Sequence, residues 1–242
     1  MTMKEVMKMN VTCLFEQSGT FKHAFERAGH NAIDIDISDK FGETNMICDI
    51  FDQLDGYIEN FDFMVESFIK ADLIIAFFPC TWFSNFNILI WSRKWKNFKY
   101  DMFKTEQDIT DYINARRAKY DRAVKCLFKL IDLCKRFKKP LIIENPVSIE
   151  IIKLLGEPTY TDNNRTLHGD NFKKPTVFYC YGCKITDLDI IPKTIEKTVL
   201  NENKGINRSL INPDYADNFV KHIEIEGYID ITDKDKYLLK YE

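Results

Sequence analysis

Short apolar runs alternate with helical patterns over the first two thirds of the chain. The stretch 73–78 is continuously apolar, as buried parallel strands are, and shorter or alternating runs occupy residues 10–15, 32–37, 45–50 and 140–143. Apolar residues three and four positions apart indicate helices over residues 19–28 and from about Thr105, which with Asp108 can cap the start, to Phe137. Strands that alternate with helices predict an α/β fold: a doubly wound, mostly parallel, Rossmann-like sheet with helices on both faces and a small C-terminal extension.

No repeat, low-complexity tract or flexible linker interrupts this pattern, so residues 1–242 are predicted to form one domain. Residues 85–137 are predicted to be a helical insertion or lid between the fourth and fifth strands. With 45% hydrophobic and 29% charged residues and a net charge of −3, the composition excludes membrane, collagen-like and disordered classes. The near-neutral charge also argues against coating of nucleic acid, so any such contact must be confined to a patch.

The seven cysteines are an odd number scattered through apolar runs, and no signal segment opens the chain. This usage predicts free thiols in a reducing cytosol. Cys180 and Cys183 form one CxxC pair, but a structural zinc site needs four ligands, and neither a second pair nor a partner rich in histidine lies nearby. We therefore predict no metal site.

Ligands of open parallel sheets bind outside the carboxyl ends of the strands, so the residues that follow each apolar run carry most information. After the first run, residues 16–20 form a small turn that opens a helix, where backbone N–H groups can receive a polar or anionic ligand. Asp36 follows the second run, about where nucleotide-binding sheets place the acid for ribose hydroxyls, and Asp49 follows the third. The alternative for each acid is a helix cap or a turn residue.

Reactive side chains follow the fourth and fifth runs. Pro79 turns the chain out of the strand, which would place Cys80 above the sheet, where dipoles and basic neighbours favour a thiolate. The alternative is an inert thiol in the interior. Glu144 ends the fifth run, and a carboxyl in apolar surroundings holds a proton that it can donate. The two residues are predicted to act as nucleophile and acid.

A segment that interleaves aromatic and basic residues follows Cys80. It runs from Trp91 through Trp95 to Tyr100, and stacking rings beside cations suit a flipped base or a single strand. The alternative is a lid that packs both tryptophans into the interior. The basic face of the long helix that follows is best explained as a solvated surface.

The chain resembles the S-adenosylmethionine-dependent DNA cytosine carbon-5 methyltransferases, most closely the compact versions carried by bacteriophages. The resemblance rests on these motifs in this order: Leu14-Phe15-x-x-Ser18-Gly19-Thr20, Asp36, Cys48-Asp49-Ile50, Pro79-Cys80-x-x-Phe83-Ser84 and Glu144-Asn145-Pro146. Phe172–Val177 is similar to the basic segment of the small relatives, and Arg208-Ser209 with Pro213 to their closing motif.

The resemblance implies a role for each residue. Phe15, Ser18, Gly19 and Pro79 would surround S-adenosylmethionine, with Asp36 on the ribose hydroxyls and Asp49 on the adenine amino group. Cys80 would attack carbon 6 of cytosine and make carbon 5 nucleophilic, while Glu144 would donate to or hydrogen-bond the ring nitrogen. Contacts to the substrate, DNA with a flipped or single-stranded cytosine, would come from Ser84, Arg165, Lys173 and Lys174. Trp91 and Trp95 of the aromatic segment are added to these contacts on the composition of that segment alone.

The chain departs from the family pattern in ways that leave other functions open. Gln17 replaces the first glycine of the cofactor turn and would narrow the pocket, Phe78 replaces a proline, and lysines stand where arginines are usual. Only residues 178–207 are available as a reduced recognition region, which predicts relaxed specificity. The alternatives are a catalytically degenerate protein that binds a nucleotide or cofactor, an enzyme for RNA or a free pyrimidine nucleotide, and a thiol enzyme unrelated to methyl transfer.

Overall fold

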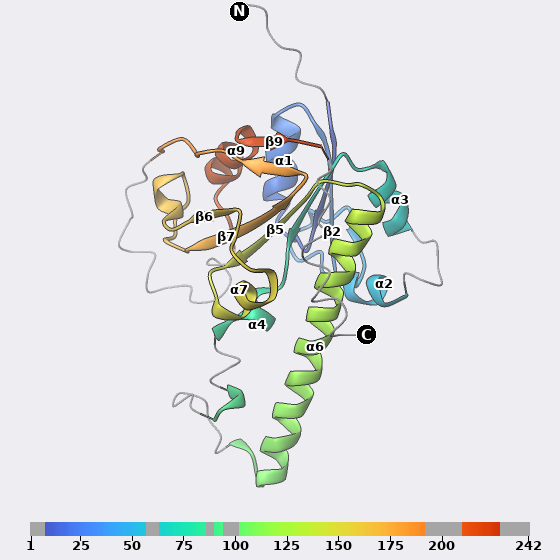
Figure 1. Ribbon diagram of the computed structural model, residues 1–242, viewed down its shortest axis with the longest axis vertical. Coiled ribbons are helices and arrows are strands. Elements are labelled where there is room, and N and C mark those ends of the chain that lie inside the picture. The colour runs from blue at the N-terminus through green and yellow to red at the C-terminus, as the bar shows by residue number, and fades with distance from the viewer. Residues whose placement is uncertain (1–7, 57–62, 86–89, 94–101, 192–209, 228–242) are drawn as a thin grey trace, which may run out of the picture.

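The centre of the molecule is a seven-stranded sheet with strand order β3-β2-β1-β4-β5-β7-β6 (Figure 1). The computed structural model describes residues 8–56, 63–85, 90–93, 102–191 and 210–227. Strands β1 to β5 pair in parallel, and β7 runs antiparallel to both β5 and β6. The strands are β1 (Asn10–Leu14), β2 (Asn31–Asp36), β3 (Met46–Ile47), β4 (Leu73–Phe77), β5 (Leu141–Pro146), β6 (Tyr160–Asp162) and β7 (Thr176–Tyr181). The predicted α/β class with a mostly parallel sheet is confirmed.

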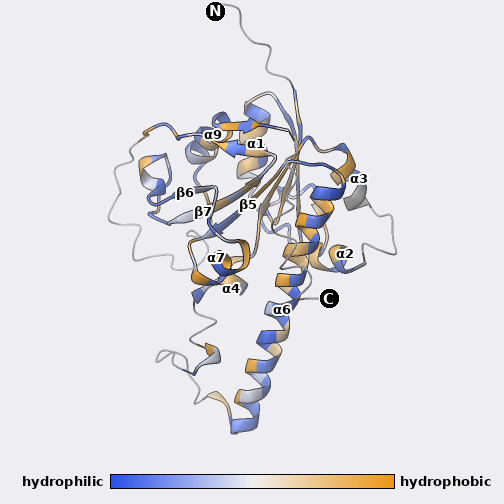
Figure 2. Cartoon of the chain, in the orientation of Figure 1, coloured by the Kyte–Doolittle hydropathy of each residue, from blue (hydrophilic) through white to orange (hydrophobic). Residues whose placement is uncertain are grey.

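Helices cover both faces of this sheet. One face packs on α1 (Thr20–Arg27) and α9 (Pro213–Lys221) through a core that includes Phe21 and Phe219. The other face packs on α2 (Ile50–Gly56), α3 (Phe63–Lys70), α6 (Glu106–Arg136) and α7 (Ile149–Leu155). Because both faces are covered, the central strand β4 is apolar along its whole length, and the hydropathy colouring shows the mixture of apolar and polar residues in the elements around it (Figure 2). Among the helices in the described ranges, none combines the length and apolarity needed to cross a bilayer.

Helix α6 dominates the predicted insertion 85–137. Its start is closed by the predicted capping box: the Thr105 hydroxyl accepts from the Asp108 N–H at 3.1 Å, and the Asp108 carboxylate accepts from the Thr105 N–H at 2.8 Å. The C-terminal half packs on the sheet, whereas the N-terminal half projects beyond it (Figure 1). Ile109 and Ile113 of this projecting part form a small apolar cluster with Ile90. Residues 86–89 and 94–101 of the insertion lie outside the described residues.

The first part of the segment 178–207, the predicted recognition region, lies in strands. Residues up to Tyr181 belong to β7, which lies between β5 and β6 in the sheet. The next strand, β8 (Cys183–Ile185), pairs with β9 (Ile223–Ile225) in a two-stranded ribbon. The physical reason is the run Thr176–Tyr181, which is buried at every position and fills the space beside β5. Residues 192–207 of the predicted recognition region lie outside the described residues.

A buried ion pair fastens the turn after β6. Arg165, in the short helix η2 (Arg165–Leu167), is 1% exposed and pairs with Asp170, which is also 1% exposed. The guanidinium lies over the ring of Tyr215 in α9, with its carbon 4.7 Å from the ring centroid. Removing one partner of a fully buried pair leaves the other charge without compensation.

We expect Asp170→Asn to lower the free energy of unfolding by about 3–5 kcal/mol, because the Arg165 charge then stays buried and unpaired. Asp217→Asn is the matched control, since Arg27 and Asp217 pair at 2.7 Å with both side chains partly exposed. This change should cost about 1 kcal/mol or less. Urea denaturation of both variants checks the difference, and equal losses would show that the buried pair is not important for stability.

Candidate active site

A cleft lies where the strand order reverses. From β1 the sheet grows outward through β2 and β3, and the chain then returns to place β4 on the other side of β1. The loops that leave β1 and β4 therefore diverge, and ligands of open parallel sheets bind between such loops. The cleft at this edge has a volume of about 450 Å³, within the range of small-molecule sites. It is lined by residues 15–18, 36, 37, 41, 77–81, 144, 146, 174, 210 and 211.

Phe15 forms part of an aromatic wall of the cleft. Its backbone has a φ of 59°, a left-handed conformation that is rare for a bulky residue and that turns the chain sharply out of β1. Its ring packs against Phe78 and Phe51, with centroid distances of 4.7 and 5.5 Å. Phe15 and Phe78 both face the cleft and offer a rigid apolar surface to a flat ring.

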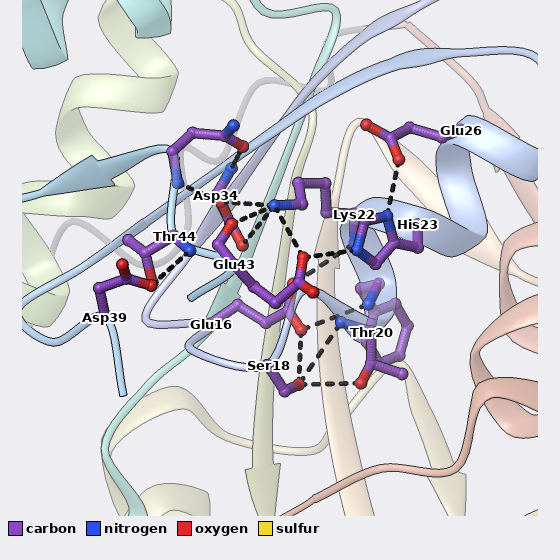
Figure 3. Close-up of polar contacts among 12 residues, drawn as sticks. Glu16, Ser18, Thr20, Lys22, His23, Glu26, Asp34, Asp39, Glu43 and Thr44 are labelled. Carbon is purple, nitrogen blue, oxygen red and sulfur yellow. Dashed lines mark hydrogen bonds and ion pairs between the residues drawn. The ribbon is translucent and has the colours of Figure 1, made fainter. Parts of the chain in front are cut away.

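The turn after β1 is occupied by a carboxylate of the chain itself. Glu16 is buried, and its two oxygens accept from the Phe21 and Lys22 N–H groups at the start of α1, both at 3.3 Å (Figure 3). The Ser18 hydroxyl donates to the same carboxylate at 2.9 Å. The expectation of an open anion site was therefore wrong, because Glu16 already caps the helix. Burial raises the pKa of this carboxyl.

Sequence reasoning missed Glu16 as a residue of the site. The signal was present, since it is an acid directly after a buried strand, as Asp36 and Glu144 are at the ends of theirs. Gln17, which departs from the family pattern, also lines the cleft and so takes up space in it. The predicted residue Ser18 lines the cleft beside them.

The loop after β2 closes another side of the cleft. Asp36 is buried and faces the cleft, one of its oxygens accepts from the Ser38 N–H at 2.9 Å, and burial raises the pKa of the carboxyl. Ile37 and Phe41 line the cleft from the same loop and are both exposed. The structure thus places the predicted residue Asp36 in the lining of the cleft.

Polar contacts hold this loop against α1 (Figure 3). The Lys22 ammonium is buried, lies 3.3 Å from the Asp34 carboxylate, and donates to the Glu43 backbone carbonyl. The His23 Nε2 atom lies 2.8 Å from the Glu43 carboxylate. The predicted residue Gly19 caps α1 with a φ of 66°, and a Cβ there would lie 3.1 Å from the Glu43 Cβ. Gly19 supports the loop but does not line the cleft.

Asp49 has a structural role in the described residues. Its carboxylate accepts from the Phe51 N–H at 2.9 Å and from the Asp52 N–H at 3.4 Å, which caps the start of α2. It is not among the residues that line the cleft. The alternative weighed from the sequence, a helix cap, accounts for these contacts.

Cys80 stands at the rim of the cleft on the loop that leaves β4. Pro79 lines the cleft and caps the short helix α4 (Cys80–Phe83), and Cys80 is the exposed one of the seven cysteines, all of which are free thiols. The buried Asn145 amide donates to the Phe78 carbonyl at 2.9 Å and so anchors this loop to β5. The walls of the cleft desolvate the thiol and raise the pKa of Cys80, with Lys174 opposing and Glu144 adding to this effect. Desolvation thus opposes the predicted preference for a thiolate, whereas the basic neighbour Lys174 favours it.

Glu144 faces the same cleft from the neighbouring strand. It is paired with Phe77 across the parallel β4 and β5 strands, three residues before Cys80. Its side chain is buried, and its Oε1 atom has no hydrogen-bond partner among the described residues. An unsatisfied buried carboxyl oxygen is costly, and a ligand that donates a hydrogen bond would relieve that cost.

The predicted substrate residues are divided. Lys174 lines the cleft, whereas Lys173 is exposed outside it. Arg165 is buried with Asp170 and does not reach the cleft, because its guanidinium is used in the ion pair beneath it. The prediction that Arg165 contacts the substrate is therefore wrong, and the residue has a structural role.

The aromatic segment after Cys80 packs on α6 where it is described. Trp91 contacts Tyr120 with ring centroids 5.0 Å apart, and the Arg117 guanidinium lies over the Trp91 ring. These contacts agree with the alternative in which this tryptophan packs against the protein. Ser84 caps the end of α4 and does not line the cleft. Trp95 lies outside the described residues. Within the described ranges, no three His, Cys, Asp or Glu residues are grouped so that they could hold a metal ion.

Comparison with known proteins adds no relative to this picture. The chain matches no model of a known protein family, and no curated protein sequence matches it. Functional conclusions therefore depend on the geometry of the cleft and on the motifs that form it.

We expect Gly19→Ala to destabilise the protein more than Gly42→Ala. Both glycines have a left-handed φ, which costs a residue with a Cβ about 1 kcal/mol. A Cβ at Gly42 meets nothing within 4 Å, whereas at Gly19 it pushes on Glu43 and loosens the contact of Glu43 with His23. Urea denaturation should show an additional loss of about 1 kcal/mol for Gly19→Ala. Identical losses would mean that the loop shifts without cost.

Proposed function

We propose that the protein is an S-adenosylmethionine-dependent methyltransferase that acts on carbon 5 of cytosine, in DNA. One observation carries the proposal: Cys80 and the unpaired carboxyl of Glu144 come from adjacent parallel strands and line one cleft. A thiol that adds to a pyrimidine ring and an acid that contacts the ring nitrogen need this convergence. Free thiols are consistent with the cytosol as the location.

The chemistry of the cleft fits the proposed cofactor. Glu16 and Asp36 line it with buried carboxyls, which suit the positive sulfonium and ammonium groups and the ribose hydroxyls of S-adenosylmethionine. Phe15, Ile37 and Phe41 supply apolar surface for the adenine ring. The sulfonium of S-adenosylmethionine, when the cofactor is bound, supplies the methyl group. Ser18 and Pro79 complete the residues that we assign to the cofactor, whereas Gly19 and Asp49 act through the loop and the helix that they support.

The residues of the chain then divide the work of the reaction. Cys80 loses its proton to solvent, and its sulfur forms a bond to carbon 6 of the cytosine, which moves the electron pair of the 5,6 double bond towards carbon 5. Glu144 hydrogen-bonds or protonates the ring nitrogen, so negative charge does not accumulate there. Once carbon 5 carries the methyl group, its proton leaves to solvent, the bond between carbon 6 and the Cys80 sulfur breaks, and the 5,6 double bond and the thiolate are restored. Because carbon 6 is hidden in a stacked duplex, the target base must be flipped out or already single-stranded.

A second function is favoured by one departure in the cofactor turn. Gln17 lines the cleft where the family has glycine, and this side chain competes with a ligand for space. A protein that binds a nucleotide on the same fold without catalysis would tolerate that residue.

The position of 178–185 in strands also leaves RNA or a free pyrimidine nucleotide as substrates, since little chain remains to read a duplex.

We expect the wild-type protein to transfer labelled methyl groups from S-adenosylmethionine to cytosine-containing DNA. Cys80→Ala should abolish transfer, and Glu144→Gln should reduce kcat by about 10²-fold or more, because each change removes a group that touches the ring. Cys48→Ala is the matched control, since this half-buried thiol does not line the cleft. RNA and free nucleotides are tested in parallel. A folded wild type that binds the cofactor but modifies none of these substrates would leave only the binding function.

We expect Asp36→Asn to weaken binding of S-adenosylmethionine by at least about tenfold, because hydrogen bonds to a charged group contribute about 1.5–3 kcal/mol. Asp49→Asn should change the affinity little, because Asn caps a helix as well as Asp and the residue does not face the cleft. Titration calorimetry measures both, with a nucleotide panel as the comparison. Tight binding of a nucleotide instead of the cofactor would support the second function.

A further inference from the structure

Lys174 is the cation of a cleft that is otherwise acidic. Among the described residues that line the cleft, three carry carboxyls (Glu16, Asp36 and Glu144), and Lys174 is the only one with a cationic side chain. No hydrogen bond or ion pair to the Lys174 ammonium is formed by the described residues. An ammonium held in a cleft without a fixed carboxylate partner is available to stabilise a negative charge that develops there.

A buried network fixes the backbone that carries Lys174. The Thr176 hydroxyl donates to the Lys174 carbonyl at 2.9 Å, and the Arg165 guanidinium approaches the same hydroxyl at 3.5 Å. Arg165 is itself held by Asp170 and by the ring of Tyr215. The next residue, Pro175, accepts at its carbonyl from the Val147 N–H at 3.0 Å, directly after the Glu144-Asn145-Pro146 motif. The lysine is therefore attached to the rigid β5–β7 pair.

The thiol of Cys80 faces opposing influences in this cleft. Desolvation by the walls raises the pKa of the thiol, Lys174 lowers it, and Glu144 raises it. The nucleophile is the thiolate, so a cation that lines the same cleft increases the fraction of thiolate at neutral pH. Among the described lining residues, only Lys174 can play this part.

We propose that Lys174 is the electrostatic partner that stabilises the Cys80 thiolate, and that Thr176 and Arg165 are positioning residues that hold Lys174 for this task. The proposal deepens the proposed function, because it takes Cys80 as the nucleophile. The proton leaves the Cys80 sulfur for solvent at the mouth of the cleft, and the ammonium of Lys174 keeps its own proton and charge throughout.

Alkylation of the free protein with iodoacetamide tests this without any methyl transfer. The Cys80 sulfur forms a bond to the methylene carbon as the carbon–iodine bond breaks and iodide leaves, so the rate follows the thiolate fraction. The rate at Cys80 is measured by mass spectrometry of its peptide over a range of pH. Cys134, which is 2% exposed, serves as an internal reporter of folding because it reacts only when the protein opens.

Lys174→Met should move the alkylation profile upward by about one pH unit, which is about a tenfold lower rate at a pH below the midpoint. Lys174→Arg should keep the wild-type profile because it keeps the charge, and Lys173→Met is the matched control with its charge outside the cleft. A Lys174→Met profile that overlays the wild type, with Cys134 still protected, would overturn the proposal.

Thr176→Val tests the positioning role, because valine has nearly the same shape but cannot bond the Lys174 carbonyl. We expect a shift in the same direction that is smaller than that of Lys174→Met, and an unchanged profile would refute the role of Thr176. The methyl-transfer assay distinguishes failure of the proposed function from failure of the proposed role of Lys174. A shifted alkylation profile without methyl transfer would refute the proposed function alone, whereas methyl transfer with an unshifted profile would refute the role of Lys174 alone.

Discussion

The parallel pairing of β4 with β5 is the constraint on which the candidate site depends. It sets Phe77 opposite Glu144, so that the chain leaving β4 must pass over the end of β5. The Asn145 amide then holds the Phe78 carbonyl, and Pro79 directs the next residue, Cys80, to the rim. A shift of this register by one residue would turn the Glu144 side chain to the opposite face of the sheet. The strand pairing and the Asn145 bond thus bring Cys80 and Glu144 to the lining of the same cleft.

Burial of charge organises the opposite wall in the same way. Glu16 accepts from two N–H groups of α1 and thereby closes the helix start, while the Lys22 ammonium below it joins Asp34 to the loop that follows β2. Glu16 and Lys22 thus both have polar partners, which offset the cost of their desolvation. The result is a loop held by polar contacts that presents apolar side chains to the cleft, an arrangement that suits a ligand with a flat ring and a cationic end.

Much of this could be predicted from the sequence, because parallel strands are continuous apolar runs and their carboxyl ends share one edge. Asp36, Cys80 and Glu144 follow from that rule alone. What could not be predicted depends on three-dimensional partners. The burial of Arg165 requires Asp170 and Tyr215 to meet it, and the strand at Thr176–Tyr181 pairs antiparallel with a partner about thirty residues earlier. The direction of the shift in the pKa of Cys80 depends on desolvation by walls that a linear pattern does not contain.

A cleft of this composition has to reconcile two opposing electrostatic demands. Carboxyls that would attract the proposed cationic cofactor also oppose the formation of a thiolate beside them, since like charges in a poorly solvated space raise each other's cost of ionisation. A freely mobile lysine would satisfy the nearest carboxylate and leave the sulfur neutral. Lys174 stands just before β7, and the bond from the Thr176 hydroxyl to the Lys174 carbonyl fixes its backbone, so its ammonium loses part of that freedom. The same sheet that places Glu144 and Cys80 in one cleft thus also limits how closely the carboxylates of that cleft can approach the Lys174 ammonium.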